Sequence, residues 1–154
     1  MNNRIIRFWA PVILWMVCVF LMSSGMFSSE NTSRIIEPIL KFLFPAISTH
    51  LLHLVHAIIR KMAHLTEYFI LALLLFRAFK SGSTEKHGLR WAALSLLVVA
   101  LYATTDEFHQ TFVPSRGPSI VDVGIDTTGG FLALTVALFW YDRRTRTNAT
   151  MMKG

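Results

Sequence analysis

Ionisable residues follow directly after one of the most apolar stretches of the sequence. The segment TTDEFHQTF, residues 104–112, carries Asp106, Glu107, His109 and Gln110 after the nearly uncharged run LRWAALSLLVVALYA. Carboxylate, imidazole and amide groups can bind cations, hold polar headgroups or move protons. The place of this group at the end of an apolar run raises the question of what surrounds it.

Two other apolar stretches carry ionisable residues of the same kinds. In KMAHLTEY, residues 61–68, and DVGID, residues 122–126, the polar residues recur at spacings of three or four, which share one face of a helix. The loop VPSRGPSI, residues 113–120, adds a cation. Together these segments predict a ligand-binding pocket formed by Lys61, His64, Glu67, Tyr68, Asp106, Glu107, Gln110, Arg116, Asp122 and Asp126.

The composition indicates that lipid surrounds the elements that carry these residues. The chain has 154 residues, of which 53% are hydrophobic and 16% charged, whereas roughly 25% of residues are charged in soluble domains. This length fits a single domain, residues 1–154. Cys18 is the only cysteine, so no intrachain disulfide can form.

Four stretches are long and apolar enough to cross a hydrocarbon core of about 30 Å, which takes about 20 helical residues. They predict an all-α bundle of four transmembrane helices, at residues 8–27, 62–79, 90–112 and 122–141, followed by a basic tail, residues 142–154. The first stretch also has features of a cleaved signal peptide. Its apolar run exceeds the usual length of about 7–15 residues, which favours a retained helix.

Basic residues are distributed unevenly between the two sides of such a bundle. Ten fall on the side of the termini: Arg4, Arg7, Arg77, Lys80, Lys86, Arg90, Arg143, Arg144, Arg146 and Lys153. Five fall on the other side: Arg34, Lys41, Arg60, Lys61 and Arg116. The positive-inside rule then predicts a multi-pass protein of the bacterial plasma membrane with both termini in the cytoplasm. Topology thus explains the net charge of +6 without nucleic acid as a partner.

The first extracytoplasmic loop has an amphipathic pattern. Between residues 33 and 60, apolar residues recur at helical spacing, and Pro38 and Pro45 interrupt the pattern. This predicts a proline-interrupted amphipathic helix, which either lies on the outer membrane surface or packs on the bundle. The sequence leaves both placements open.

The three groups of polar residues are expected at the same depth. With a rise of about 1.5 Å per residue, His64, Asp106 and Asp126 lie roughly 24, 22 and 21 Å from the cytoplasmic ends of their spans. Charged residues inside a span cost at least about 2.5 kcal/mol each unless they pair or face a wet cavity. They should therefore face one another, in a layer that opens outward. Gly129 and Gly130 suit the close approach of neighbouring helices.

Several functions are compatible with such a layer. It could be a structural lock between helices, a binding site, an acid–base site of a lipid-processing enzyme, or a metal or proton site. The number of ionisable groups favours a functional site over a lock. The sequence contains no recognised nucleophile motif and no dense ligand spacing for a metal, so no cofactor or metal is predicted and the enzyme class stays open.

The same segments resemble the VanZ-like family of small bacterial membrane proteins. The matching pieces are IRKMAHLTEYFIL, DEFHQTFVPSRGPSIVDVGIDTTGG and the serine-rich LMSSGMFSSENTS. The family pattern coincides with Lys61, His64, Glu67, Tyr68, Asp106, Glu107, Gln110, Pro114, Arg116, Asp122 and Gly129. Asp126 stands where this family often has Asn, which adds a carboxylate to the site.

The resemblance implies a role at the cell envelope. The family takes its name from an accessory protein linked to resistance to the glycopeptide teicoplanin, and it implies no established reaction and no cofactor. Membrane lipid is therefore the expected partner. A lipid-linked wall precursor and a lipid-targeting glycopeptide are further candidates. An enzyme acting on a lipid-linked substrate is the alternative.

Overall fold

The computed structural model describes residues 3–24, 29–83, 88–113 and 117–151. These residues form helices and connections, with no strand among them. The helices are α1 (Asn3–Ser23), α2 (Ser29–Leu43), α3 (Thr49–Lys80), α4 (Leu89–Gln110) and α5 (Ile120–Met151). The expectation of an all-α fold is confirmed.

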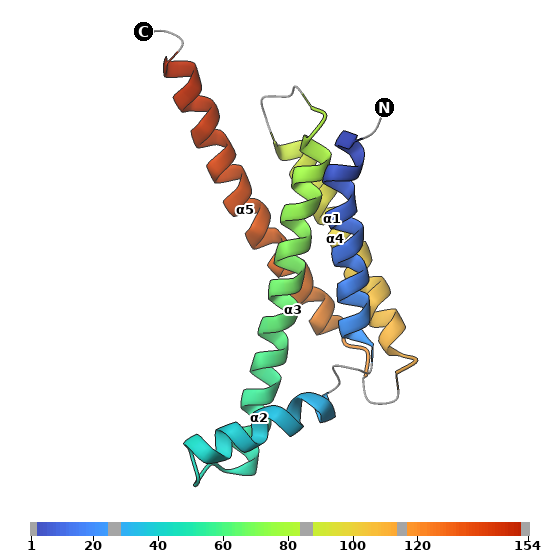
Figure 1. Ribbon diagram of the computed structural model, residues 1–154, viewed down its shortest axis with the longest axis vertical. Coiled ribbons are helices and arrows are strands. Elements are labelled where there is room, and N and C mark those ends of the chain that lie inside the picture. The colour runs from blue at the N-terminus through green and yellow to red at the C-terminus, as the bar shows by residue number, and fades with distance from the viewer. Residues whose placement is uncertain (1–2, 25–28, 84–87, 114–116, 152–154) are drawn as a thin grey trace.

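Four of these helices are long and apolar enough to cross a membrane: α1, α3, α4 and the part of α5 at Ile120–Arg144. They pack side by side, while α2 lies across the long axis of the molecule, beyond the ends of α1, α4 and α5 (Figure 1). The buried apolar core lies where the four long helices meet. It includes Val12, Val19, Leu71, Ala72, Leu75, Val99, Ala103 and Ala133.

The segment between the first two spans was predicted to be an amphipathic helix interrupted at Pro38 and Pro45, and the structure places a break only near Pro45. α2 contains Pro38 and ends at Leu43, and Pro45 lies in the turn that follows. Proline lacks an N–H group and disfavours the helical conformation of the residue before it, which explains the break near Pro45. Pro38 does not break α2, and both Pro38 and Arg34, whose carbonyl loses its helical N–H donor, are exposed residues.

Residues 49–60, assigned from the sequence to the amphipathic loop, instead form the first turns of α3. Ser48 begins this helix, because its Oγ accepts a hydrogen bond from the N–H of Leu51 at 3.2 Å. The 32 residues of α3 give a rod of about 48 Å, longer than the hydrocarbon core of a bilayer. At its start, α3 extends beyond the other spans, and α2 lies at that end of the molecule (Figure 1).

Two glycines allow α5 to approach its neighbours closely, as the sequence suggested. A Cβ atom at Gly129 would collide with the carbonyl oxygen of Leu65 in α3. A Cβ atom at Gly130 would lie 2.8 Å from Cγ1 of Val99 in α4. Consequently the first half of α5 packs tightly in the bundle, and its second half diverges from it (Figure 1).

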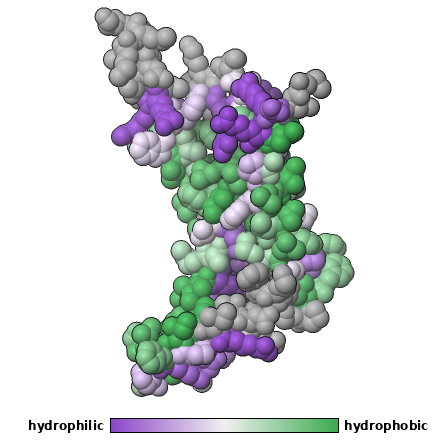
Figure 2. All heavy atoms as spheres, viewed as in Figure 1, coloured by the Kyte–Doolittle hydropathy of each residue, from purple (hydrophilic) through white to green (hydrophobic). Residues whose placement is uncertain are grey.

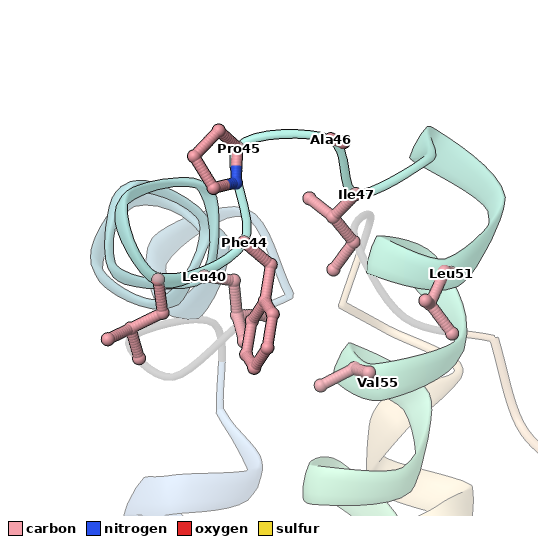
Figure 3. A pocket seen from close by; sticks show the side chains of 8 residues that line it. Leu40, Phe44, Pro45, Ala46, Ile47, Leu51 and Val55 are labelled. Carbon is pink, nitrogen blue, oxygen red and sulfur yellow. The ribbon is translucent and has the colours of Figure 1, made fainter.

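Both ends of the chain lie at one end of the molecule (Figure 1). We call this end of the molecule the basic end. There, cations lie over aromatic rings: Arg77 over Phe8, Lys80 over Tyr141, Arg90 over Trp91 and Arg143 over Phe139. An apolar belt separates this end from a second group of hydrophilic residues nearer α2 (Figure 2). The candidate site lies where α3 and α4 contact the start of α5.

Candidate functional site

Two contacts between a basic and an acidic side chain join α3 to α5 on successive turns. Lys61 Nζ lies 2.6 Å from Asp122 Oδ1, and His64 Nδ1 lies 3.5 Å from Asp126 Oδ1. The pairs stack because residues three or four positions apart share a helix face. Arg60, which the sequence did not identify as a site residue, adds a third contact, at 3.8 Å from Asp122 Oδ2.

The start of α5 gathers two carboxylates. Ser119 precedes the helix, and its Oγ accepts a hydrogen bond from the N–H of Asp122 at 3.3 Å. The N–H of Ser119 itself donates to Oε2 of Glu107 in α4, at 2.7 Å. Unsatisfied N–H groups and the helix dipole make this end of a helix favourable for negative charge. The fold thus explains why Asp122 and Glu107 can lie so close together.

A third set of contacts brings α1 to the site. Nε2 of Gln110 donates to Oγ of Ser23 at 3.0 Å and lies 3.4 Å from Oδ2 of Asp106. Sequence reasoning did not identify Ser23, although it lies in the serine-rich exit of the first span. The indole of Trp15 in α1 also donates to the carbonyl of Glu67, at 2.9 Å. These bonds fix α1 against both α3 and α4.

Burial divides the predicted site residues into two groups. Those in the deep part are almost fully buried: His64, Tyr68, Asp106, Glu107, Gln110 and Asp126. Toward α2, the side chains of Lys61, Arg60 and Asp122 are 47%, 34% and 13% exposed. Glu67 is partly buried. Arg116 lies outside the described residues. The site is therefore open at its outer edge and closed at depth.

Several buried acceptor atoms in this layer have no hydrogen-bond partner in the described part of the chain. They include Oε1 of Glu107, Oε1 of Gln110 and the hydroxyl oxygen of Tyr68. A buried polar atom left unpaired costs about 1–3 kcal/mol. Such atoms are consistent with a site that receives hydrogen-bond donors from a ligand.

Other histidines stand apart from this layer. The ring of His109, considered as an acid–base residue from the sequence, packs on the ring of Phe20 with centroids 4.4 Å apart. Among the residues that the structure describes, no three His, Cys, Asp or Glu side chains are arranged to hold a metal ion. The ion pairs are thus the main electrostatic feature of the site.

Comparison with protein families covers the whole of this arrangement. The model of the VanZ/LLP1 family matches residues 8–141, from the start of α1 to the second half of α5. The chain belongs to the VanZ/LLP1 family. The family match includes every residue of the candidate site and ends before the last turns of α5. No curated protein and no solved structure matches the chain.

The family assignment therefore agrees with the resemblance found in the sequence. For this VanZ/LLP1 chain, it supports a multi-pass membrane protein with four candidate spans.

Proposed function

We propose that this VanZ/LLP1 protein lies in the bacterial plasma membrane with its basic end in the cytoplasm. Basic residues next to spans favour the cytoplasmic side, and aromatic rings at that end suit the membrane interface. The polar layer then lies toward the outer leaflet. α2, with its apolar face exposed at Ile39, Phe42 and Leu43, lies at the outer surface.

We propose that the polar layer binds the headgroup of an outer-leaflet lipid. The observation that carries this proposal is the Lys61–Asp122 pair, which is partly exposed at the outer edge and has a buried polar layer directly behind it. Ionisable groups inside a membrane are costly and usually mark a site. A structural lock between helices needs only a few polar contacts. Here the polar contacts are more numerous and join all four of α1, α3, α4 and α5.

The proposal predicts a lipid that stays bound during purification. Native mass spectrometry of the purified protein in a mild detergent should show a bound lipid, and Asp122→Asn should lose it. Asp142→Asn is the matched control, since Asp142 is an exposed residue of the same helix at the basic end. If well-folded protein carries no lipid, or if both variants keep it equally, the site does not bind headgroups.

Modulation of the cell envelope is the physiological consequence that we propose. Cells that lack the protein should change in susceptibility to teicoplanin-type glycopeptides, and the wild-type gene should restore the original susceptibility. The Asp122→Asn gene should fail to restore it, while Asp142→Asn should succeed. Equal restoration by both would separate envelope modulation from the polar layer.

A further inference from the structure

Arg60, Lys61 and Asp122 form the outer edge of the site, and Glu107 is buried beside the start of α5. We call these four residues the rim. In their usual states they carry two positive and two negative charges. Arg60 and Lys61 both lie on Asp122, so this one carboxylate accepts both cations. The positive and negative charges of the rim are therefore equal in number, but both cations contact Asp122 and neither is paired with Glu107.

The carboxylate of Glu107 can accept a further hydrogen bond. One of its oxygens, Oε2, is held by the N–H of Ser119 at 2.7 Å, which fixes the orientation of the carboxylate. The other oxygen, Oε1, is buried and has no hydrogen-bond donor anywhere in the described ranges, in a side chain only 5% exposed. A fixed, desolvated carboxylate oxygen of this kind strongly favours a charged donor.

The present pairing also shows which group the rim accepts. Lys61 places a primary ammonium on Asp122 at 2.6 Å, and its side chain is 47% exposed and long enough to turn elsewhere. An ammonium has three N–H donors, so one such group can serve two carboxylates. If a ligand supplied the ammonium, Lys61 and Arg60 would be released to bind an anion.

We propose that the rim binds a zwitterionic phospholipid headgroup that carries a primary ammonium. The phosphate lies on Arg60 and Lys61, and the ammonium lies between Asp122 and Oε1 of Glu107. This inference rests on the proposed lipid-binding function and narrows its ligand. No charge is left without a partner. The phosphate replaces Asp122 as the partner of Arg60 and Lys61, and the ammonium takes their place on Asp122.

Other headgroups fit this rim less well. A headgroup with a phosphate but no amine draws Lys61 and Arg60 away and leaves two carboxylates without a cation, which is unfavourable near hydrocarbon. A trimethylammonium headgroup supplies the positive charge but no N–H donor for Glu107. The primary ammonium is thus the group that satisfies both carboxylates.

The test compares three lipids with identical acyl chains: phosphatidylethanolamine, phosphatidylcholine and phosphatidylglycerol. Delipidated full-length protein is exposed to equimolar pairs, and the bound lipid is quantified by native mass spectrometry. We expect phosphatidylethanolamine to be retained about tenfold over either competitor, a factor equivalent to about 1.4 kcal/mol. The Glu107→Gln variant should lose most of this preference. Glu37→Gln, an exposed carboxylate of α2 paired with Lys41, should keep it.

The outcomes separate the two levels of the proposal. Equal retention of the three lipids, with binding still lost in Asp122→Asn, would overturn the ammonium inference and leave headgroup binding intact. Preference for phosphatidylglycerol would overturn it as well, in favour of a phosphate site alone. Binding of none of the lipids by folded protein would refute both. The wild-type preference decides the inference even if Glu107→Gln fails to fold.

Discussion

The two ends of the bundle both contain cations, but they place them in opposite surroundings. At the basic end, Arg77 lies 5.1 Å from the ring centre of Phe8, and Arg143 lies 4.4 Å from that of Phe139. Ring faces attract cations without requiring their burial. In the polar layer, Lys61 instead lies on the Asp122 carboxylate at the edge of the site, and His64 lies on the fully buried carboxylate of Asp126.

This contrast suggests different roles for the two ends: the cations of the basic end anchor the protein at the membrane surface, and those of the polar layer bind a ligand. Cations over rings at a surface can be replaced one by one, because water remains available to each of them. Charges inside a bundle depend on each other, since removal of one leaves its partner buried and unpaired. We therefore expect substitutions in the polar layer to be far more damaging than substitutions at the basic end.

The largest effect is expected for the His64–Asp126 pair. His64→Leu removes the polar partner of a carboxylate that is 0% exposed and should lower the free energy of unfolding by about 3–5 kcal/mol. Reversible unfolding in mixed micelles measures this loss. The double variant His64→Leu/Asp126→Leu should recover much of the stability. A loss below about 1 kcal/mol in the single variant would show that the pair behaves like a surface pair.

A smaller effect is expected where α5 meets α3 one turn from that pair. Gly129→Ala places a Cβ against the carbonyl of Leu65, and such overpacking typically costs about 1–3 kcal/mol. Gly124→Ala is the matched control, because its Cβ would meet no atom within 4 Å. That control should be neutral or slightly stabilising, through helix propensity. Equal stability of both variants in the same unfolding assay would contradict the close approach of α5.

The smallest effect is expected at the basic end. Arg143→Gln removes one cation from the ring of Phe139 and should change the free energy of unfolding by about 0.5–1 kcal/mol at most. The unfolding assay used for His64→Leu provides the comparison. The outcome against our interpretation would be a loss as large as that of His64→Leu, which would make the two ends equivalent.

Much of the polar layer could be predicted because helices have a fixed rise and period. Equal depths in three spans predicted that His64 and Asp126 would meet, and the structure places them 3.5 Å apart. The close approach of α5 at Gly129 and Gly130 could also be predicted, because small residues in a span mark close contacts between helices. The role of these residues in binding remains a prediction.

Other features depend on the positions of helix ends, which the periodicity of a sequence defines poorly. Arg60 contacts Asp122 only because α3 continues without a break through residues 49–60. Ser23 reaches Gln110 only because α1 ends beside the end of α4. The two prolines of the loop looked alike in the sequence, but only Pro45 coincides with a break in the helix.

The bond between Glu107 and the start of α5 has a consequence for biogenesis. Helices enter the membrane in the order of synthesis, so α4 arrives with Glu107 before the N–H of Ser119 can bind its carboxylate. α4 is also the least apolar of the four candidate spans. The fold therefore links the stable insertion of α4 to the arrival of the segment that begins α5, which supplies the N–H group that binds Glu107.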